Sequence, residues 1–312
     1  VIWVLIGTVI VIITVPAMAP SHHDAKWLFT EFLNETGYSN SGLVFLLGLL
    51  QAGWTLTGYE AGAQIVEGTK RADITAPRGI IVSVLGAAIQ GFLLIISALF
   101  SIQDVDELIN ADLTVTVFLQ RAVGNSLAAF FLVILLVAQF GSLCNSILAT
   151  GHLFWAMARD NCIPYASFWY KLSDKGRIPF RALLLQLFVS IVVIMPIFGT
   201  EVYWEAIMST AVICINVSYG LPLLCRLVWV RRDMPKGPFS LGKAGIVLNI
   251  ISVCWITFFM VILCIPSSFP VLPETMNWSC LMIGVVFLFA QGFWLASGRK
   301  GFKGPMQNID ED

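Results

Sequence analysis

Long apolar segments separated by short polar connections organise the whole chain. About twenty apolar residues allow a helix to cross the hydrocarbon core of a membrane, and eight segments meet this criterion. They cover residues 1–19, 42–66, 79–101, 126–157, 180–199, 203–230, 244–266 and 277–297. The fourth is too long for the bilayer alone, and Pro196 interrupts the fifth. The pattern predicts an all-α polytopic membrane protein with about eight transmembrane helices and a tail over residues 298–312.

The composition supports this class of protein. Hydrophobic residues make up 58% of the 312 residues, charged residues 12%, and the mean hydropathy is +0.85, which is too apolar for a soluble domain. The basic residues form short clusters rather than one face, so we expect a lipid bilayer and no nucleic acid as a partner. The chain opens directly in an apolar run without the features of a signal peptide. We expect it to be the carboxyl part of a longer polypeptide.

The basic residues also predict an orientation, because Lys and Arg concentrate on the cytoplasmic side of membrane proteins. All of them except Lys26 and Arg121 fall in alternate connections and in the tail: Lys70, Arg71, Arg78, Arg159, Lys171, Lys175, Arg177, Arg181, Arg226, Arg231, Arg232, Lys236, Lys243, Arg299, Lys300 and Lys303. We therefore expect a cytoplasmic carboxyl terminus. The plasma membrane is the expected location, with a vacuolar or other endomembrane as the alternative.

A polar, glycine-bearing break lies inside the second apolar segment, in Trp54-Thr-Leu-Thr-Gly-Tyr-Glu-Ala-Gly-Ala63. A carboxylate in hydrocarbon costs roughly 2.5 to 3.5 kcal/mol, and each glycine lowers helix propensity by about 1 kcal/mol relative to alanine. Interrupted helices expose backbone NH and CO groups, which transporters use to bind solutes. We expect an interruption near residues 57–61. The alternative is a continuous helix whose glycines allow close packing and whose Glu60 bonds a neighbour.

Two other segments carry polar stripes at helical spacing. The fourth segment has Gln139, Ser142, Asn145 and Ser146, and the sixth has Glu205, Ser209, Asn216, Tyr219 and Gly220. Such stripes either contact a solute or make hydrogen bonds between helices, worth about 0.6 kcal/mol each. For the stripe at Asn145 the two interpretations are balanced, whereas for the sixth segment we favour the structural role.

The sequence indicates no enzyme chemistry and no cofactor. It lacks a Ser/His/Asp set and a phosphate-binding loop. His22 and His23 are adjacent to Asp24 but lack a further ligand at helical spacing, so no metal site is expected. The seven cysteines lie mainly inside apolar segments without paired spacing, which predicts no disulfide framework.

Three motifs follow one another along the chain. The first is Gly58-Tyr-Glu-Ala-Gly-Ala63 with the following Glu67, Thr69-Lys70 and Pro77-Arg78-Gly79. The others are Phe154-Trp-Ala-Met-Ala-Arg-Asp-Asn-Cys-Ile-Pro164 and Gly237-Pro-Phe-Ser-Leu-Gly242. Together they resemble the amino acid-polyamine-organocation superfamily of transporters, especially its fungal and plant amino acid, GABA and choline permease branch.

This resemblance covers essentially the whole chain and implies a five-plus-five inverted-repeat transporter fold. Family members have twelve helices, and the segments here correspond to helices five to twelve. Residues 1–19 would be helix five, residues 42–230 the complete second repeat, and residues 244–297 the last two helices. The first helix of the family contributes a glycine motif to the substrate site, and that half matches no residue of this sequence.

The resemblance implies a secondary transporter of amino acids or related small amines such as GABA or choline, working by alternating access. Backbone groups from Thr57, Gly58 and Ala61 would bind substrate together with the charge of Glu60. Trp54 or Tyr59 would supply an aromatic lid, and Asn145 side-chain specificity. Coupling to a proton, or exchange, stays open. The alternative is a truncated, transport-incompetent membrane protein with at most a scaffold role.

Overall fold

The computed structural model describes residues 2–59, 61–64, 66, 69–173, 178–229, 237–242, 244–302 and 304. These residues form helices, turns and connections, and no β-strand occurs among them. They divide into two compact units, which are described separately. The first consists of Val1–Leu33 and Ile81–Ser146, and the second of Asn34–Ile80 and Ile147–Asp312.

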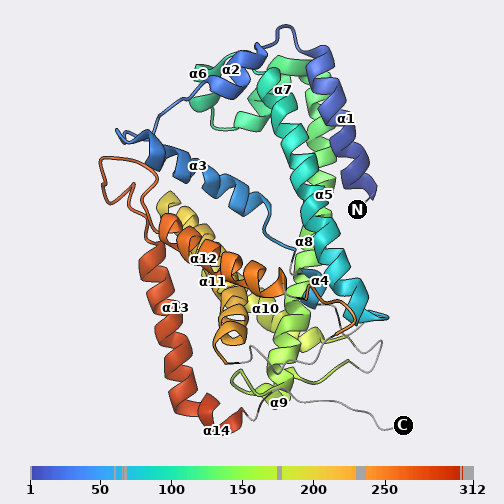
Figure 1. The fold of residues 1–312 in the computed structure, drawn as a ribbon, viewed down its shortest axis with the longest axis vertical. Coiled ribbons are helices and arrows are strands. Elements are labelled where there is room, and N and C mark those ends of the chain that lie inside the picture. Colours follow the sequence, from blue (N-terminus) through green and yellow to red (C-terminus); the bar gives the residue numbers. More distant parts are fainter. Residues whose placement is uncertain are drawn as a thin grey trace. The chain divides into compact units, whose positions relative to one another are not determined.

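Helices account for most of the described chain (Figure 1). They are α1 (Ile2–Met18), α2 (Ala25–Thr30), α3 (Ser41–Thr55), α4 (Ala61–Gln64), α5 (Ala72–Phe100), α6 (Val105–Ile109), α7 (Thr114–Val123), α8 (Asn125–Arg159), α9 (Ala166–Trp169), α10 (Phe180–Ile194), the 3-10 helix η2 (Met195–Phe198), α11 (Glu201–Val228), α12 (Ala244–Leu263), α13 (Ser279–Phe293), the π-helical η3 (Trp294–Gly298) and α14 (Arg299–Gly301).

Six of the described helical stretches are long and apolar enough to cross a membrane: α5, α8, α10 with η2, α11, α12, and α13 with η3. Two shorter apolar helices, α1 and α3, have 17 and 15 residues. The sequence prediction of an all-α polytopic membrane protein is confirmed.

The outer faces of these helices are apolar. On α5, Val82, Leu85, Ile89 and Phe92 are exposed, and their spacing places them on one face of the helix. Exposure of such a stripe to water would cost about 25 cal/mol per Å² of apolar surface relative to its burial. Lipid removes this penalty, because acyl chains are as apolar as the side chains.

In the first unit, α1, α7 and α8 share a core. Phe131 of α8 is 1% exposed and packs in one cluster with Val15 and Leu119. Hydrogen bonds join further helices to α1: the Ser97 hydroxyl of α5 donates to the Ile12 carbonyl over 2.9 Å, and the Trp3 indole donates to the Ile134 carbonyl over 3.3 Å. These bonds satisfy polar groups that lipid cannot satisfy.

Two helices, α6 and α7, lie in the connection between α5 and α8, where the sequence pattern indicated only a link. Asp104 caps α6 by accepting a hydrogen bond from the Glu107 backbone NH over 3.1 Å. Glu107 then forms an ion pair of 2.6 Å with Arg121 of α7. The hydrogen bond and the negative charge of Glu107 raise the pKa of Arg121.

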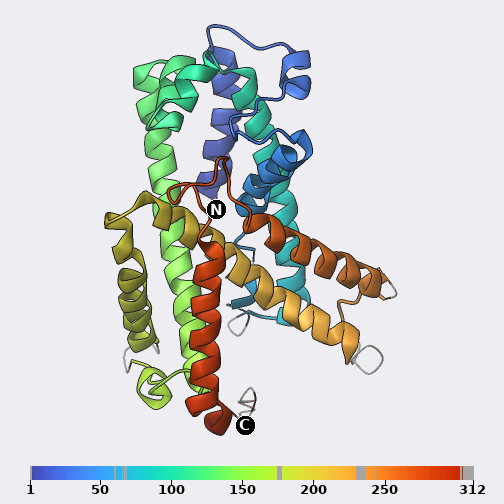
Figure 2. The same cartoon turned by 90° about the vertical axis from the view of Figure 1, so that its left-hand side faces the viewer.

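In the second unit, α11 packs against α12, and both views show these two helices as neighbours (Figures 1 and 2). Val212 and Ile213 of α11 and Phe259 and Leu263 of α12 form a buried cluster, against which Leu50 of α3 packs. The helix α13 also contacts α11. The core of this unit therefore connects α3, α11 and α12.

Proline interrupts one of the long predicted segments but not another, and a third segment is longer than the bilayer is thick. The fifth predicted segment changes from α to 3-10 helix at Met195, immediately before Pro196. In contrast, α11 continues through Asn216 and Pro222, and the Asn216 side-chain amide donates to the Val212 carbonyl of its own helix over 2.8 Å. The 35 residues of α8 extend roughly 52 Å at 1.5 Å per residue, more than the hydrocarbon core of about 30 Å.

Candidate functional site

The helix that carries the glycine-bearing motif is broken. It starts as α3 behind Asn40, whose side chain accepts hydrogen bonds from the backbone NH groups of Gly42 and Leu43 at 2.9 and 3.3 Å. This N-cap satisfies two of the free donors at the helix start. The helix ends at Thr55, and α4 begins at Ala61. A turn separates the two helical segments.

Backbone hydrogen bonds define the turn. The Thr57 NH donates to the Trp54 carbonyl over 3.1 Å, and the Ala61 NH donates to the Gly58 carbonyl over 3.3 Å. The Thr57 hydroxyl donates back to the Gly53 carbonyl over 3.0 Å. Gly58 has a φ of +107°, a conformation that residues with a Cβ rarely adopt. The chain therefore leaves the helical path where glycine permits it.

One aromatic contact joins the turn to α11. The rings of Tyr59 and Tyr219 have their centroids 5.5 Å apart and are tilted by 35°, within the range of favourable aromatic pairs. Glu60, the carboxylate of the predicted site, lies outside the described residues.

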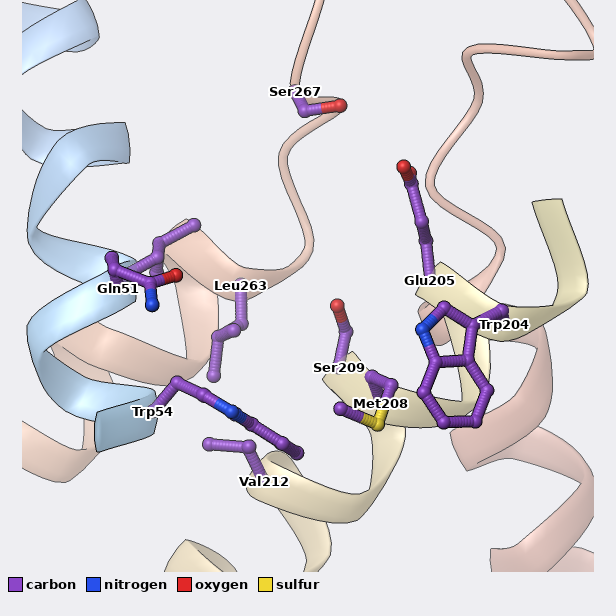
Figure 3. Close-up of a pocket in the computed structure, with 10 residues that line it drawn as sticks. Gln51, Trp54, Trp204, Glu205, Met208, Ser209, Val212, Leu263 and Ser267 are labelled. Carbon is purple, nitrogen blue, oxygen red and sulfur yellow. The ribbon is translucent and has the colours of Figure 1, made fainter. Parts of the chain in front are cut away.

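A pocket of about 320 Å³ opens directly next to the last turn of α3 (Figure 3). Its volume falls at the lower end of the range for small-molecule sites, about 300 to 1,000 Å³. Residues from α3, α11, α12 and the connection after α12 line it: Leu50, Gln51, Trp54, Trp204, Glu205, Met208, Ser209, Val212, Leu263 and Ser267.

Helical periodicity explains which side chains reach the pocket. On α3 the lining residues Leu50, Gln51 and Trp54 are spaced i, i+1 and i+4. The lining residues of α11, from Trp204 to Val212, follow the same pattern over just more than two helical turns. In Figure 3, Gln51 and Trp54 lie on one side of the space, with Trp204, Glu205 and Ser209 on the other. Two helices distant in sequence thus supply facing walls.

The pocket combines one negative charge with apolar and aromatic surface. Of the described residues that line it, Glu205 alone is charged. Among the described residues, none donates a hydrogen bond to the Glu205 carboxylate or forms an ion pair with it. Trp54 and Trp204 remain 38% and 45% exposed, so their indole faces are accessible. The arrangement offers a negative charge and π surface to a small solute.

The predicted site residues fall into three groups. Trp54 lines the pocket, and its backbone carbonyl also caps the turn. Thr57, Gly58 and Tyr59 form the turn, while Ala61 begins α4. None of these four lines the pocket. Asn145 is exposed on α8 in the first unit and is likewise not a lining residue.

Sequence reasoning assigned Glu205 and Ser209 mainly a structural role between helices, and it did not single out Trp204 or Gln51. In the structure Glu205 and Ser209 line the pocket, and neither makes a side-chain hydrogen bond to another helix among the described residues. The usable signal was the carboxylate of Glu205 inside an apolar segment, because such residues are costly and mark functional cavities.

Secondary transporters bind solutes at interrupted membrane helices that border a small cavity. The described residues form an all-α polytopic membrane protein with such a break beside a pocket. A family model described as amino acid permease matches residues 1–287. The chain belongs to the amino acid permease family.

Similar proteins occur in plants and fungi. The chain is 32% identical to an amino-acid permease BAT1 homolog of Oryza sativa subsp. japonica, over 99% of this chain and 61% of that protein. It is 28% identical to amino-acid permease BAT1 of Arabidopsis thaliana, over 98% of this chain and 62% of the relative. A choline transporter of Saccharomyces cerevisiae is 27% identical over 93% of this chain and 52% of its own length. The chain thus spans less than two thirds of these relatives.

Proposed function

We propose that the chain takes part in secondary transport of amino acids or related small amines across a membrane. The observation that carries this proposal is the turn between α3 and α4, which joins directly to the pocket through Trp54. A broken helix can change direction at its turn, and transporters place the binding sites of charged or zwitterionic solutes at such breaks. GABA and choline are candidate substrates beside amino acids.

In this mechanism the solute reaches the pocket at Glu205 and Trp54 and then passes toward the turn at Gly58. Alternating access would reorient α3 and α4 relative to the surrounding helices, with Trp54 or Tyr59 covering the solute. Glu60 would supply a negative charge near the turn, and Asn145 side-chain specificity. These roles follow from the chemistry of the residues and from the resemblance of the motif.

The orientation belongs to the proposal as well. The first turns of α11 and the end of α12 border the pocket, and the distribution of Lys and Arg assigns these helix ends to the non-cytoplasmic side. The pocket would then open outward, and the carboxyl terminus would face the cytoplasm. We propose the plasma membrane as the location.

Uptake into proteoliposomes that contain the purified 312-residue chain tests the function. Radiolabelled amino acids, GABA and choline are offered outside, with and without an inward proton gradient, and empty liposomes give the background. We expect saturable uptake of at least one of them. Trp54→Ala should lower kcat/KM at least tenfold, because it removes the wall between pocket and turn. Trp229→Ala, which changes a tryptophan that is 74% exposed at the end of α11, should stay within twofold.

The same measurements separate the alternatives. Stimulation by the proton gradient would indicate symport, whereas uptake that requires substrate inside the liposomes would indicate exchange. If monodisperse, reconstituted protein gives no uptake of any of these compounds, the proposal fails and the transport-incompetent alternative stands.

A further inference from the structure

The pocket is lined in part by charged and aromatic side chains that do not belong to the interrupted-helix motif. The charged residue in its described lining, Glu205, belongs to α11 rather than to the motif, and it stands on the opposite wall from Trp54 (Figure 3). We infer that this pocket is a binding site for an organic cation, with Glu205 as its counter-ion and the indoles of Trp54 and Trp204 as its aromatic walls. The inference rests on the proposed function, since it specifies the substrate class of the same site.

The first argument is electrostatic. Among the described residues, no Lys, Arg or His lines the pocket, and none forms an ion pair with the Glu205 carboxylate. A carboxylate at the edge of low-dielectric surroundings attracts a cation more strongly than one in open water, because the effective dielectric constant falls from about 80 toward about 20 near a protein surface. An anion or a solute carboxylate would be repelled at the same place. The pocket therefore selects by charge.

The second argument concerns the aromatic walls. Tryptophan is the strongest partner for cation–π contacts, which contribute roughly 0.5 to 2 kcal/mol, and quaternary ammonium groups are recognised in this way. Trp54 and Trp204 come from different helices and line the same space. Met208 lies between them on the α11 wall (Figure 3) and adds a polarisable thioether that adapts to alkyl groups. Methylated or alkylated ammonium groups suit this lining better than a strongly hydrated metal ion would.

The third argument concerns orientation of the solute. The Ser209 hydroxyl stands one helical turn after Glu205 on the same wall, and Gln51 faces it from α3 (Figure 3). Both groups accept and donate hydrogen bonds. They would hold the neutral polar end of an amine whose cationic end lies at Glu205. A volume of about 320 Å³ admits one small amine.

Equilibrium binding to the purified chain tests this inference independently of transport. Choline serves as the probe because its charge does not depend on pH, and glycine betaine serves as its partner because it has the same trimethylammonium group with an added carboxylate. A scintillation proximity assay measures the binding of radiolabelled choline. Unlabelled choline or glycine betaine is added as the competitor. We expect half-displacement of the labelled choline to require an at least tenfold higher concentration of glycine betaine than of unlabelled choline.

Matched variants assign the selectivity to Glu205. Glu205→Gln keeps the shape of the side chain but removes its charge. It should weaken choline binding at least tenfold and reduce the difference in affinity between choline and glycine betaine. Glu274→Gln makes the same change in an exposed connection of the same unit outside the pocket, and should leave both affinities within twofold. Trp204→Leu should weaken choline binding about fivefold to tenfold through loss of the π face. Size-exclusion profiles establish that each variant is folded.

The outcomes distinguish this inference from the proposed function. Folded wild-type protein that does not bind choline, or Glu205→Gln protein that binds choline as the wild type does, overturns the cation site even if amino acid uptake is measured. Choline binding that depends on Glu205 in a protein without any uptake supports the cation site and contradicts transport by this chain.

Discussion

At the scale of single residues, Gly58 and Trp54 link the turn to the pocket. Gly58 takes the backbone through a φ of +107°, and no atom of the described residues lies within contact distance of an added Cβ. Trp54 contributes its carbonyl to the turn and its side chain to the pocket. A Cβ added at residue 58 would therefore act through backbone strain rather than through a clash with a described neighbour.

Gly58→Ala should lower the stability of the protein by about 1 to 3 kcal/mol, the usual cost of holding a residue with a Cβ in a sparsely populated region. Gly48→Ala is the matched control. Gly48 lies in the regular part of α3 and also has open space at its Cβ position, so this change should be neutral or stabilising by up to about 1 kcal/mol. Heating followed by size-exclusion chromatography measures both. Equal melting temperatures for the two variants would contradict the assigned strain.

At the scale of elements, the approach of α3 to α12 positions the pocket. Gly53 faces the ring of Phe259 so closely that a Cβ at this position would overlap the ring. Phe259 itself is 3% exposed and belongs to the cluster formed with Val212 and Leu263, two residues that also line the pocket. The absence of a side chain at residue 53 thus sets the distance between two walls of the site.

Gly53→Ala should destabilise the protein by about 1 to 3 kcal/mol, because overpacking forces neighbouring groups apart. Phe259→Leu makes room at the contact. The double variant should therefore be more stable than the sum of the two single changes predicts, since residues in contact couple. Melting temperatures of the four proteins complete the cycle. Strict additivity would show that Gly53 and Phe259 do not interact.

The elements show where sequence patterns predict structure well and where they do not. The apolar stripes of α5, α8 and α12 are long and uniform, so hydropathy alone identifies them. The helices α6 and α7 escaped prediction because they are short and lie in a polar connection, stabilised by contacts such as the ion pair between Glu107 and Arg121. A contact between residues of two separate helices leaves no pattern in the sequence near either residue.

At the scale of the whole molecule, the distribution of charge makes a claim about topology that can be tested directly. The concentration of Lys and Arg predicts that one set of connections is cytoplasmic. Glu35 and Lys171 are exposed in connections that this rule assigns to opposite sides of the membrane.

In intact cells, Glu35→Cys should react with a membrane-impermeant maleimide, whereas Lys171→Cys should react only after permeabilisation. A background in which the seven native cysteines are replaced by serine or alanine keeps the readout specific. The opposite pattern would invert the proposed orientation and place the mouth of the pocket toward the cytoplasm. Labelling of both positions in intact cells would contradict a connection on each side.

The candidate site was partly accessible from the sequence. The motif around Trp54 and Gly58 identified the turn, because glycines and a carboxylate inside an apolar segment are costly wherever the segment packs. The opposite wall was not recognised as part of a site. Glu205 and Ser209 appeared as a polar stripe, and a stripe indicates which residues share a helix face without indicating what that face meets.

The sequence by itself determined the class of protein and the position of its most irregular helix, since solvation in lipid and helix propensity act on each segment independently. Only the tertiary structure decided that Trp54 faces Glu205 across a cavity. That arrangement depends on how α3, α11 and α12 pack around Phe259, and close packing is a property of side chains brought together from distant parts of the chain.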